Sequence, residues 1–330
     1  MTLYTPSGQK VLWTPNPGPQ TRFIASSVYE LLYGGAAGGG KSEALVMAPT
    51  RWIGDKFFRG ILFRRTFPEL DKSLVERTRF YYPALGGKYH GGEHVWTFPS
   101  GAKIWLSSLQ YADSVIDHQS SEYQFVGFDE LTHFEESQYR YLLSRLRSSR
   151  GVPIRVRAGT NPDICWVKDR WAPWVNRSPE YLESGGPIAE SGEVLWFKPN
   201  ASGGEEYVPA GTPGATSRSF IRSALKDTPQ LGKDYELQLL QQDSVQRARL
   251  MDGDWEAIPA AGKYFKKDWV DFCSRDSIPK GSRLVRHWDR AGTEKGERKS
   301  KDPDWTAGVL LARKGAHYWV VDVQRFRATP

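Results

Sequence analysis

Short apolar runs alternate with amphipathic stretches through the first half of the chain. The apolar runs predict four buried strands, at 28–33, 60–64, 124–128 and 154–158. Helical periodicity follows these runs in three places, from residue 41 onward, at 70–81 and at 135–147. Because strands and helices alternate, the pattern predicts an α/β fold whose parallel sheet is covered by helices on both faces.

Two details refine this picture. Residues 94–108 read as a β-hairpin whose turn is Pro99-Ser100-Gly101. Pro49 falls within the helical pattern that starts near Lys41, and its missing N–H should end or kink that helix.

The second half of the chain is less regular. Residues 178–217 are rich in Gly, Pro, Ser and Glu, which predicts irregular connections with one hairpin among them. The strongest helical pattern runs from Tyr235 to Leu250. After a linker-like stretch at 258–262, three consecutive strands are predicted, at 284–288, 306–313 and 317–326.

Composition excludes several classes of protein. At 330 residues, with 39% hydrophobic and 25% charged residues, the chain can bury a substantial core, so wholesale disorder is excluded. No apolar run approaches the roughly 20 residues that span a bilayer, and residues 1–19 do not resemble a secretory signal. The only cysteines, Cys165 and Cys273, exclude a disulfide scaffold and a four-cysteine zinc site, so we expect an intracellular protein.

The charge balance is modestly basic. Forty-five Lys and Arg residues against 38 Asp and Glu residues give a net charge of +7. Residues 281–330 carry eleven basic and six acidic side chains, a net +5 that accounts for much of the excess. A polyanionic partner such as nucleic acid is therefore favoured, although many ordinary enzymes are equally basic.

The most specific motif is Gly35–Ser42 (GAAGGGKS), which fits the pattern GxxxxGK[ST] between a predicted strand and a predicted helix. Such a loop turns backbone N–H groups toward a β-phosphate, and the glycines that allow it lie at Gly35, Gly38, Gly39 and Gly40. Lys41 is expected to reach the β- and γ-phosphates, and the Ser42 hydroxyl to bind Mg²⁺. ATP with Mg²⁺ is therefore the expected ligand.

Two further segments supply polar groups at the ends of predicted strands. Asp129 and Glu130 follow the apolar run 124–128. Asp129 can contact the Mg²⁺ ion that Ser42 binds, through that ion's coordination shell, and Glu130 can polarise an attacking water. Thr160 and Asn161 follow the next strand and could contact the γ-phosphate or its water. An ordinary Asn-Pro turn at Asn161-Pro162 explains the second segment equally well.

These motifs, in this order, resemble the large terminase subunit of tailed bacteriophages. The resemblance rests on the phosphate loop, on Arg64–Leu70 (RRTFPEL), on the acids of FVGFDE and on AGTNP. Gly18-Pro19-Gln20 and Arg249–Trp255 (RLMDGDW) add to it. It implies a P-loop ATPase of the additional-strand, catalytic-glutamate type, followed by a nuclease of ribonuclease-H-like fold.

The resemblance also implies a domain plan. Residues 1–257 correspond to the ATPase domain, with a small lid subdomain at about 178–257. Residues 258–281 correspond to a linker, and 282–330 to the N-terminal part of the nuclease. The later strands and the C-terminal helix of that fold would lie beyond residue 330, so we expect an incomplete nuclease.

Residue roles carry over position by position. Lys41 and Ser42 match the Walker A residues, Asp129 and Glu130 match the Walker B aspartate and the catalytic glutamate, and Thr160-Asn161 match the coupling motif. Gln20 matches an adenine-contacting glutamine, although a solvated loop residue is nearly as good an interpretation. Arg64 and Arg65 match strand-ending arginines, which could instead pair with helix carboxylates.

The nuclease region offers fewer acids. Asp289 matches the first metal-binding aspartate of terminase nucleases, and Asp304 is the best match for a second; Mg²⁺ or Mn²⁺ is the implied metal. Asp322 is expected to face solvent. Since two-metal cleavage needs several converging carboxylates, we expect this chain to hydrolyse ATP without cutting DNA efficiently.

A transition-state arginine is also needed, and Arg145 or Arg147, at the end of the helical pattern 135–147, is expected to act in a neighbouring subunit. Two solvated basic residues favoured by the helix dipole are an equal alternative. The implied partners are double-stranded DNA, the small terminase subunit, the portal protein of the procapsid and further copies in a ring, with no membrane, in the host cytoplasm. A helicase-like translocase and an ATP-binding regulatory module are the alternatives, and the water-activating Glu130 argues against the second.

Overall fold

The computed structural model describes residues 11–201, 203–228, 233–257, 271–290 and 305–326. The chain divides into two compact units, Met1–Pro259 and Ala260–Pro330. The predicted linker at 258–281 lies partly outside the described residues, because 258–270 are not described.

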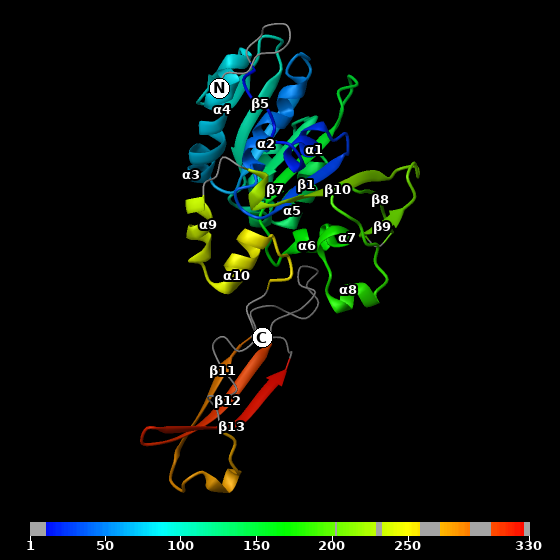
Figure 1. Cartoon of the computed structure of the whole chain (residues 1–330). Helices are drawn as coiled ribbons and strands as arrows, with labels where there is room; N and C mark the ends of the chain where they lie inside the picture. Colours follow the sequence, from blue (N-terminus) through cyan, green and yellow to red (C-terminus); the bar gives the residue numbers. More distant parts are fainter. Residues whose placement is uncertain (1–10, 202, 229–232, 258–270, 291–304, 327–330) are drawn as a thin grey trace. The chain divides into compact units, whose positions relative to one another are not determined.

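A single ten-stranded sheet organises the described part of the first unit, in the order β3-β4-β5-β2-β6-β7-β1-β10-β8-β9 (Figure 1). The six central strands of this order, from β5 through to β10, pair in parallel, and antiparallel strands extend both edges. The strands are β1 (Glu30–Gly35), β2 (Arg59–Arg64), β3 (Lys88–His90), β4 (Val95–Thr97), β5 (Lys103–Ser108), β6 (Phe125–Asp129), β7 (Arg155–Thr160), β8 (Val194–Pro199), β9 (Glu205–Val208) and β10 (Thr216–Ser223). The mixed α/β class and the mostly parallel sheet are thereby confirmed.

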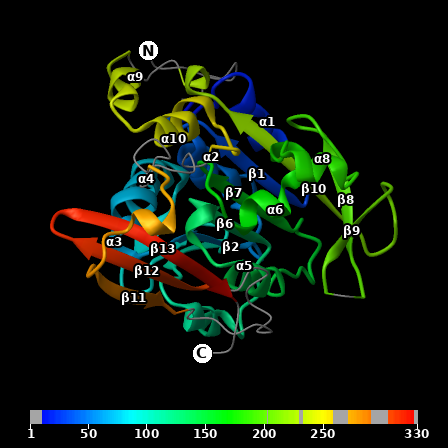
Figure 2. The same cartoon turned by 90° about the horizontal axis from the view of Figure 1, so that it is seen from below.

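Helices pack on both faces of the sheet. They are α1 (Pro19–Ala25), α2 (Lys41–Met47), α3 (Phe67–Leu70), α4 (Glu76–Tyr81), α5 (Glu136–Leu143), α6 (Trp166–Arg170), α7 (Ala172–Val175), α8 (Pro179–Glu183), α9 (Lys233–Leu240) and α10 (Ser244–Arg247). In Figure 1 and in Figure 2, α3 and α4 lie toward one side of the sheet, and α8 with the β8–β9 hairpin toward the other.

Two hydrophobic clusters hold these layers together. One contains apolar residues of α1, α2 and the neighbourhood of α4, with Leu45 and Leu74 fully buried. The other lies on the opposite sheet face around α5, α6 and α7, and includes Phe128 and Trp171. Alternate residues of one strand serve the two clusters, as with Leu31 and Leu32 of β1. This double burial explains why the central strands read as continuous apolar runs.

Most local predictions are confirmed. The β4–β5 hairpin turns at residues 98–102, and its pairing joins Thr97 to Lys103. The helix α2 ends at Met47 and gives way to a 3₁₀ turn, Ala48–Trp52, which contains Pro49. The predicted helix at 135–147 is shorter, because α5 ends at Leu143 and the chain then turns to pair beside Tyr123.

Two predictions need correction. The helix expected from Tyr235 to Leu250 is interrupted: α9 ends at Leu240, and Asp243 caps a new helix by accepting hydrogen bonds from Val245 and Gln246. The segment 178–217 is more regular than predicted. It holds the β8–β9 hairpin and also leads into β10, which pairs in parallel with β1 at the centre of the sheet.

The lid expected at about 178–257 stays a prediction. Three strands of that segment, β8 to β10, belong to the central sheet.

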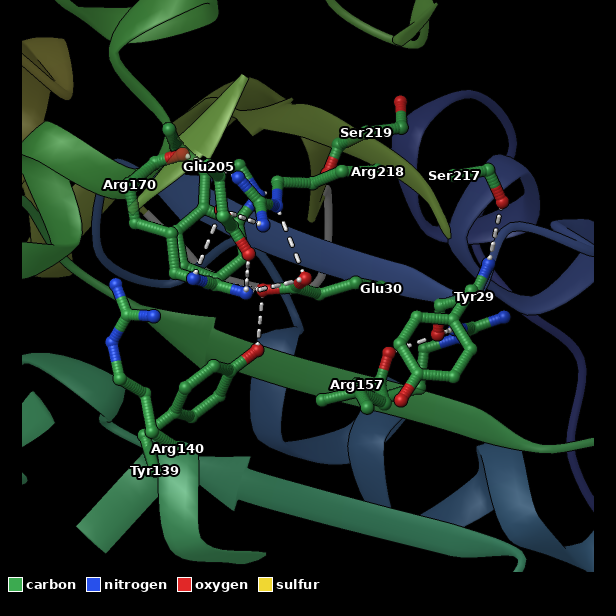
Figure 3. A network of polar contacts seen from close by, with 12 residues as sticks. Tyr29, Glu30, Tyr139, Arg140, Arg157, Arg170, Glu205, Ser217, Arg218 and Ser219 are labelled. Atoms are coloured by element: carbon green, nitrogen blue, oxygen red, sulfur yellow. Dashed lines mark hydrogen bonds and ion pairs between the residues drawn. The ribbon is translucent and has the colours of Figure 1, made fainter. Parts of the chain in front are cut away.

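A buried ionic network ties this added part to the core (Figure 3). The Glu30 carboxylate, at the start of β1, accepts hydrogen bonds from Arg170 Nε at 2.6 Å, Arg218 Nε at 3.0 Å and the Tyr139 hydroxyl at 2.6 Å. Arg170 and Arg218 also reach Glu205 on β9, at 3.2 and 2.7 Å. Two carboxylates therefore balance two guanidinium groups.

The second unit contains an antiparallel sheet in the order β11-β12-β13, with strands β11 (Arg283–Asp289), β12 (Thr306–Lys314) and β13 (His317–Phe326). These match the three strands predicted from the sequence. Across both units, no helix in the described ranges is both long and apolar enough to cross a bilayer.

Candidate functional site

The carboxyl ends of the central strands converge at one edge of the sheet. The loop after β1 lies there beside the last residues of β6, β7 and β10, because these strands run parallel and in register. Such an edge is where open α/β sheets bind their ligands. The motifs predicted from sequence are therefore brought together.

The Lys41 side chain lies within the loop itself. Its ammonium donates hydrogen bonds to the backbone oxygens of Ala36 at 2.5 Å and Gly35 at 3.5 Å, and the residue is only 7% exposed. Burial lowers the pKa of Lys41 to about 8, while the charges of Glu130 and Asp129 act in the opposite direction. This pKa still lies above neutral pH, so the ammonium form is favoured there.

Glycines are needed where the loop passes its neighbours. Gly35 has φ 131° and Gly40 has φ 70°, both unfavourable for L side chains. A Cβ at Gly39 would lie 1.7 Å from the hydroxyl of Ser223. The backbone oxygen of Ser223, at the end of β10, also accepts the Ala36 N–H at 2.9 Å, so this residue supports the loop. Nothing in the sequence points to Ser223, because its contact depends on a distant strand.

Ser42 and Asp129 form the direct link between the loop and β6. The Ser42 hydroxyl donates to Asp129 Oδ1 at 2.8 Å, and Arg64, at the end of β2, donates to Asp129 Oδ2 at 2.9 Å. Burial and the neighbouring charge of Glu130 raise the pKa of Asp129, and Arg64 and the Ser42 hydroxyl oppose this. Arg64 also lies 3.7 Å from Glu69, so the expected pairing with a helix carboxylate exists beside the contact with Asp129.

Glu130 leaves β6 in a left-handed conformation, with φ 57°. A non-glycine residue in this region costs about 1–3 kcal/mol and is retained where surrounding contacts fix it. Here the Asn161 N–H donates to Glu130 Oε2 at 3.3 Å, and the Thr160 hydroxyl lies 3.5 Å from the same oxygen. Glu130 Oε1 lies 4.0 Å from Arg64. The carboxylate is therefore held by the segment after β7.

Thr160 and Asn161 are not an isolated turn. The Thr160 hydroxyl also lies 2.8 Å from the hydroxyl of Thr132, which follows Glu130 by two residues. The buried Asn161 Oδ1 has no hydrogen-bond partner among the described residues. This buried oxygen lies beside the loop and can accept a hydrogen bond from a ligand or from a water bound to the ligand.

A pocket of about 640 Å³ opens over the loop. Residues 37–42, Glu130 and Asn161 line the part of it beside the loop. Trp13, Gln20 and Tyr235 of α9 line it as well, and the two aromatic rings offer apolar faces suited to a base. Neither aromatic could be singled out from the sequence, since neither lies near a motif.

Gln20 is buried, which excludes a solvated loop residue. It lies in the first turn of α1, is 3% exposed, and donates through Nε2 to the backbone oxygen of Gly40 at 3.0 Å. Its Oε1 accepts the Asn16 N–H at 2.6 Å. Gln20 thus braces the phosphate loop, and its contact with adenine stays a prediction.

Glu43 and Arg77 form another feature that the sequence did not reveal. Arg77 of α4 donates to Glu43 at 3.1 Å, the Tyr81 hydroxyl donates to the other Glu43 oxygen, and all three residues line the pocket. The Arg77 side chain is 44% exposed, so a solvent-accessible cation lies at the pocket wall.

Arg145 and Arg147 lie far from this pocket within the chain. Both follow α5 and adjoin Tyr123, just before β6 begins, whereas Asp129 ends that strand. Arg145 donates to the Gln119 carbonyl at 2.6 Å, and Arg147 lies 3.5 Å from Glu122. A role in hydrolysis would therefore have to be in another subunit's pocket.

The predicted nuclease acids are only partly placed. Asp289 ends β11 and is exposed, whereas Asp304 lies outside the described residues. Asp322 on β13 pairs with Arg286 of β11, so it is not simply solvated. Within the described ranges, no group of three His, Cys, Asp or Glu residues is arranged to hold a metal ion.

The pair formed by Ser42 and Asp129 suits a hard cation. Mg²⁺ prefers oxygen ligands and usually combines one or two protein oxygens with substrate phosphates and waters. The Ser42 hydroxyl and the Asp129 carboxylate, 2.8 Å apart beside the phosphate loop, provide such a set.

Comparison with known proteins bears on the family and the fold. A family model described as "Terminase large subunit, T4likevirus-type, N-terminal" matches residues 32–272. No curated protein sequence matches the chain.

Among solved structures, the large terminase of a thermophilic bacteriophage (crystal form 2) has a TM-score of 0.54 at 14% identity, covering 95% of this chain and 69% of its own. Structures of that terminase with ATP-γ-S and with ADP each give a TM-score of 0.51 at 14% identity, covering 95% and 94% of this chain and 68% of their own. These likenesses show the fold. Because the family model spans well over half of its residues, this chain belongs to the terminase large subunit family, of the T4-like virus type.

Proposed function

We propose that this chain is the subunit of a viral DNA-packaging motor that hydrolyses ATP to move double-stranded DNA into a procapsid. The observation that carries the proposal is the convergence of Lys41, the Ser42–Asp129 pair and Glu130 on one pocket over the phosphate loop. The structures of the thermophilic phage terminase with ATP-γ-S and ADP support a nucleotide as the ligand.

Binding follows from the loop and the helix behind it. The loop N–H groups and the amino end of α2 face the phosphates, and Lys41 exchanges its carbonyl contacts with Ala36 for phosphate oxygens. Ser42 and Asp129 would hold Mg²⁺, which supplies positive charge to the phosphate oxygens. Trp13 and Tyr235 contact the base, and Gln20 keeps the loop in place.

Hydrolysis depends on Glu130. Its carboxylate orients the attacking water and accepts its proton, and the contacts from Asn161 and Thr160 fix where that oxygen lies. Since Asn161 bonds to the same carboxylate, loss of the γ-phosphate can shift the segment after β7. We propose this route as the coupling of hydrolysis to movement.

The remaining assignments follow from the family. The small terminase subunit, the portal protein and a homo-oligomeric ring are the proposed partners, and the host cytoplasm, with transient docking on the procapsid, is the proposed location. Endonuclease activity with Mg²⁺ or Mn²⁺ through Asp289 is also a proposal. Plasmid cleavage by the chain, compared with Asp289→Ala, tests it, and we expect weak cutting.

The principal test is ATP turnover by the chain with and without duplex DNA, together with strand displacement. We expect turnover that duplex DNA stimulates, that Lys41→Ala abolishes and that separates no strands. Strand displacement would favour a helicase-like translocase instead. Nucleotide binding without any turnover would favour a regulatory module.

An arginine acting between subunits gives a sharper prediction. Arg145 and Arg147 lie at the end of β6 opposite the pocket, so they can serve only a neighbour. Arg145→Ala/Arg147→Ala should lose turnover by about 10³-fold or more, as removal of an arginine finger does. Mixing this inactive variant with inactive Lys41→Ala should restore part of the activity, measured as ATP turnover at fixed total protein.

The matched control mixes Lys41→Ala with Glu130→Gln. In that mixture each subunit's pocket lacks either its own Lys41 or its own Glu130, and no neighbour can replace them, so no recovery is expected. Equal recovery in both mixtures, or none in either, would contradict the trans role.

A further inference from the structure

A group of basic side chains lies at the amino-end edge of the sheet, where β2, β6 and β7 begin. Arg59 begins β2 and Arg155 begins β7. Gln124 joins them, because its N–H donates to the Arg59 carbonyl at 2.9 Å and its carbonyl accepts the Arg155 N–H at 2.8 Å. Arg51 lies in the 3₁₀ turn after α2 and precedes Trp52, whose ring packs against Phe58, next to Arg59, and against Phe125, next to Gln124. Burial lowers the pKa of Arg155, and the charge of Arg51 adds to this effect.

Lys56 and Arg150 extend this group around an exposed aromatic ring. The Lys56 ammonium lies 4.9 Å from the centroid of the Phe57 ring, and the Arg150 guanidinium lies 4.7 Å from it. Phe57 is 39% exposed. Phe57, Arg59 and Arg150 also line a pocket of about 670 Å³. We call Arg51, Lys56, Arg59, Arg150 and Arg155 the amino-end basic surface.

None of these five cations has a carboxylate within ion-pair distance among the described residues. Arg59 donates instead to the backbone oxygens of Lys56, Phe58 and Gly101. Arg155 donates to its neighbour's carbonyl, and its buried Nε has no hydrogen-bond partner in that part of the chain. The surface therefore holds positive charge that the fold itself does not neutralise.

A further arginine beneath the surface increases this charge. Arg157 of β7 is fully buried and donates only to backbone oxygens, including those of Val28 at 2.9 Å and Ser26 at 2.8 Å. Burial, together with the charges of Arg155 and Arg51, lowers its pKa to about 9. Like charges this close are unfavourable unless an anion is bound beside them.

Four acids lie nearby, and among the described residues only Glu122 has an ion-pair partner. The Asp55 carboxylate accepts the N–H of Phe57 at 2.8 Å, and Glu122 pairs with Arg147 at 3.5 Å. Glu93 and Asp117 line the pocket beside the surface. Arg145 and Arg147 adjoin the same edge, but each already has a partner, so we leave them out of the basic surface.

We propose that the amino-end basic surface binds the sugar-phosphate backbone of double-stranded DNA. The choice of DNA among polyanions rests on the proposed packaging function. A guanidinium group can donate to two phosphate oxygens at once. The Arg59 guanidinium is already oriented by the backbone carbonyls of Lys56 and Phe58. The five residues of β6 place the nucleotide pocket about 16 Å away at the opposite edge, so both ligands can be bound together.

Salt dependence of DNA binding tests the proposal. The full chain is titrated against a labelled duplex of about 30 base pairs at several salt concentrations, and the triple variant Arg51→Gln/Lys56→Gln/Arg150→Gln is compared with the unchanged chain. These three side chains are exposed, so the fold should be retained. Each phosphate contact contributes about 0.9 to the slope of log K against log salt, so the slope should fall by about 2–3.

A control variant removes the same charge elsewhere: Lys198→Gln/Arg222→Gln/Arg247→Gln, three exposed cations of β8, β10 and α10. We expect its slope to change by less than half as much. An unchanged slope in the first variant, or an equal change in the control, overturns the proposal. The proposal is also overturned if a parallel titration with inorganic phosphate shows weaker phosphate binding by the first variant while its binding of the duplex is unchanged. ATP turnover without DNA should be unchanged in both variants. A chain that hydrolyses no ATP would overturn the proposed function, but DNA binding by this surface could still be tested because it is measured directly.

Discussion

Replacing Glu130 by Gln should leave ATP binding intact and lower ATP turnover by about 10²–10⁴-fold, the usual contribution of a positioned general base. The amide keeps the size of the side chain and can still accept the Asn161 N–H that now bonds to Glu130 Oε2. It cannot take a proton from water. The loss should therefore fall on turnover alone, with little change in nucleotide affinity.

Measurement requires both quantities on the same protein. Nucleotide affinity comes from equilibrium titration with a non-hydrolysable analogue, and turnover comes from phosphate release at saturating ATP. Glu136→Gln is the matched control, because Glu136 is a partly exposed carboxylate near the same strand end and pairs only with Arg140 on its own helix. Near-normal turnover in Glu130→Gln, or an equal loss in the control, would show that another group activates the water.

The position of the Glu130 carboxylate also depends on its neighbours. Arg64 lies 2.9 Å from Asp129 and 4.0 Å from Glu130, so its charge holds both groups together. Removing Arg64 would leave two adjacent carboxylates, of which Asp129 is already buried and has a raised pKa. Arg64 is therefore a positioning residue for the pair in the state without nucleotide.

The parts of the fold that could be predicted from the sequence are those with local signals. Strands β1, β2 and β6 are buried on both faces, so each contains an apolar run. The phosphate loop and the acids after β6 are contiguous motifs, and their convergence follows from parallel strands ending at one edge.

The parts that could not be predicted depend on distant contacts. β10 (TSRSFIRS) carries two arginines and four serine or threonine residues, so it does not read as a central strand. Two contacts with residues distant in sequence join β10 to the core: Arg218 pairs with Glu30 of β1, and the Ser223 hydroxyl donates to the Ala36 carbonyl in the phosphate loop. Likewise, the role of Gln20 depends on a hydrogen bond to Gly40, 20 residues away.

Glu30 is the clearest such case, and its replacement by Gln should destabilise the fold by about 3–5 kcal/mol, as breaking one partner of a buried ion pair does. The side chain is 1% exposed and bonds to Arg170, Arg218 and Tyr139. A neutral amide would leave two buried guanidinium groups with only Glu205 to balance them, and its NH₂ group would face their donors (Figure 3).

The pH dependence of this effect has a definite sign. Burial alone would raise the pKa of Glu30, but the charges of Arg170 and Arg218, with hydrogen bonds from Arg170 and Tyr139, lower it from 4.5 to about 2. The folded pKa lies below the unfolded one, so the stabilisation is fully present above about pH 4.5 and is lost as the pH falls toward 2. A shift of this size corresponds to about 3 kcal/mol, in line with the loss expected on substitution.

Urea unfolding of both proteins at pH 7, 5, 4 and 3 measures this dependence. The difference in unfolding free energy between the unchanged chain and Glu30→Gln should be constant from pH 7 to 5 and shrink below about pH 4.5. Glu206→Gln is the control, since Glu206 is exposed on β9 next to Glu205, and it should cost at most about 0.5 kcal/mol. A difference that stays constant down to pH 3 would show that the arginines are stabilised by the shape of the site rather than by the Glu30 charge, and that β10 is held beside β1 by its backbone ladder and apolar contacts alone.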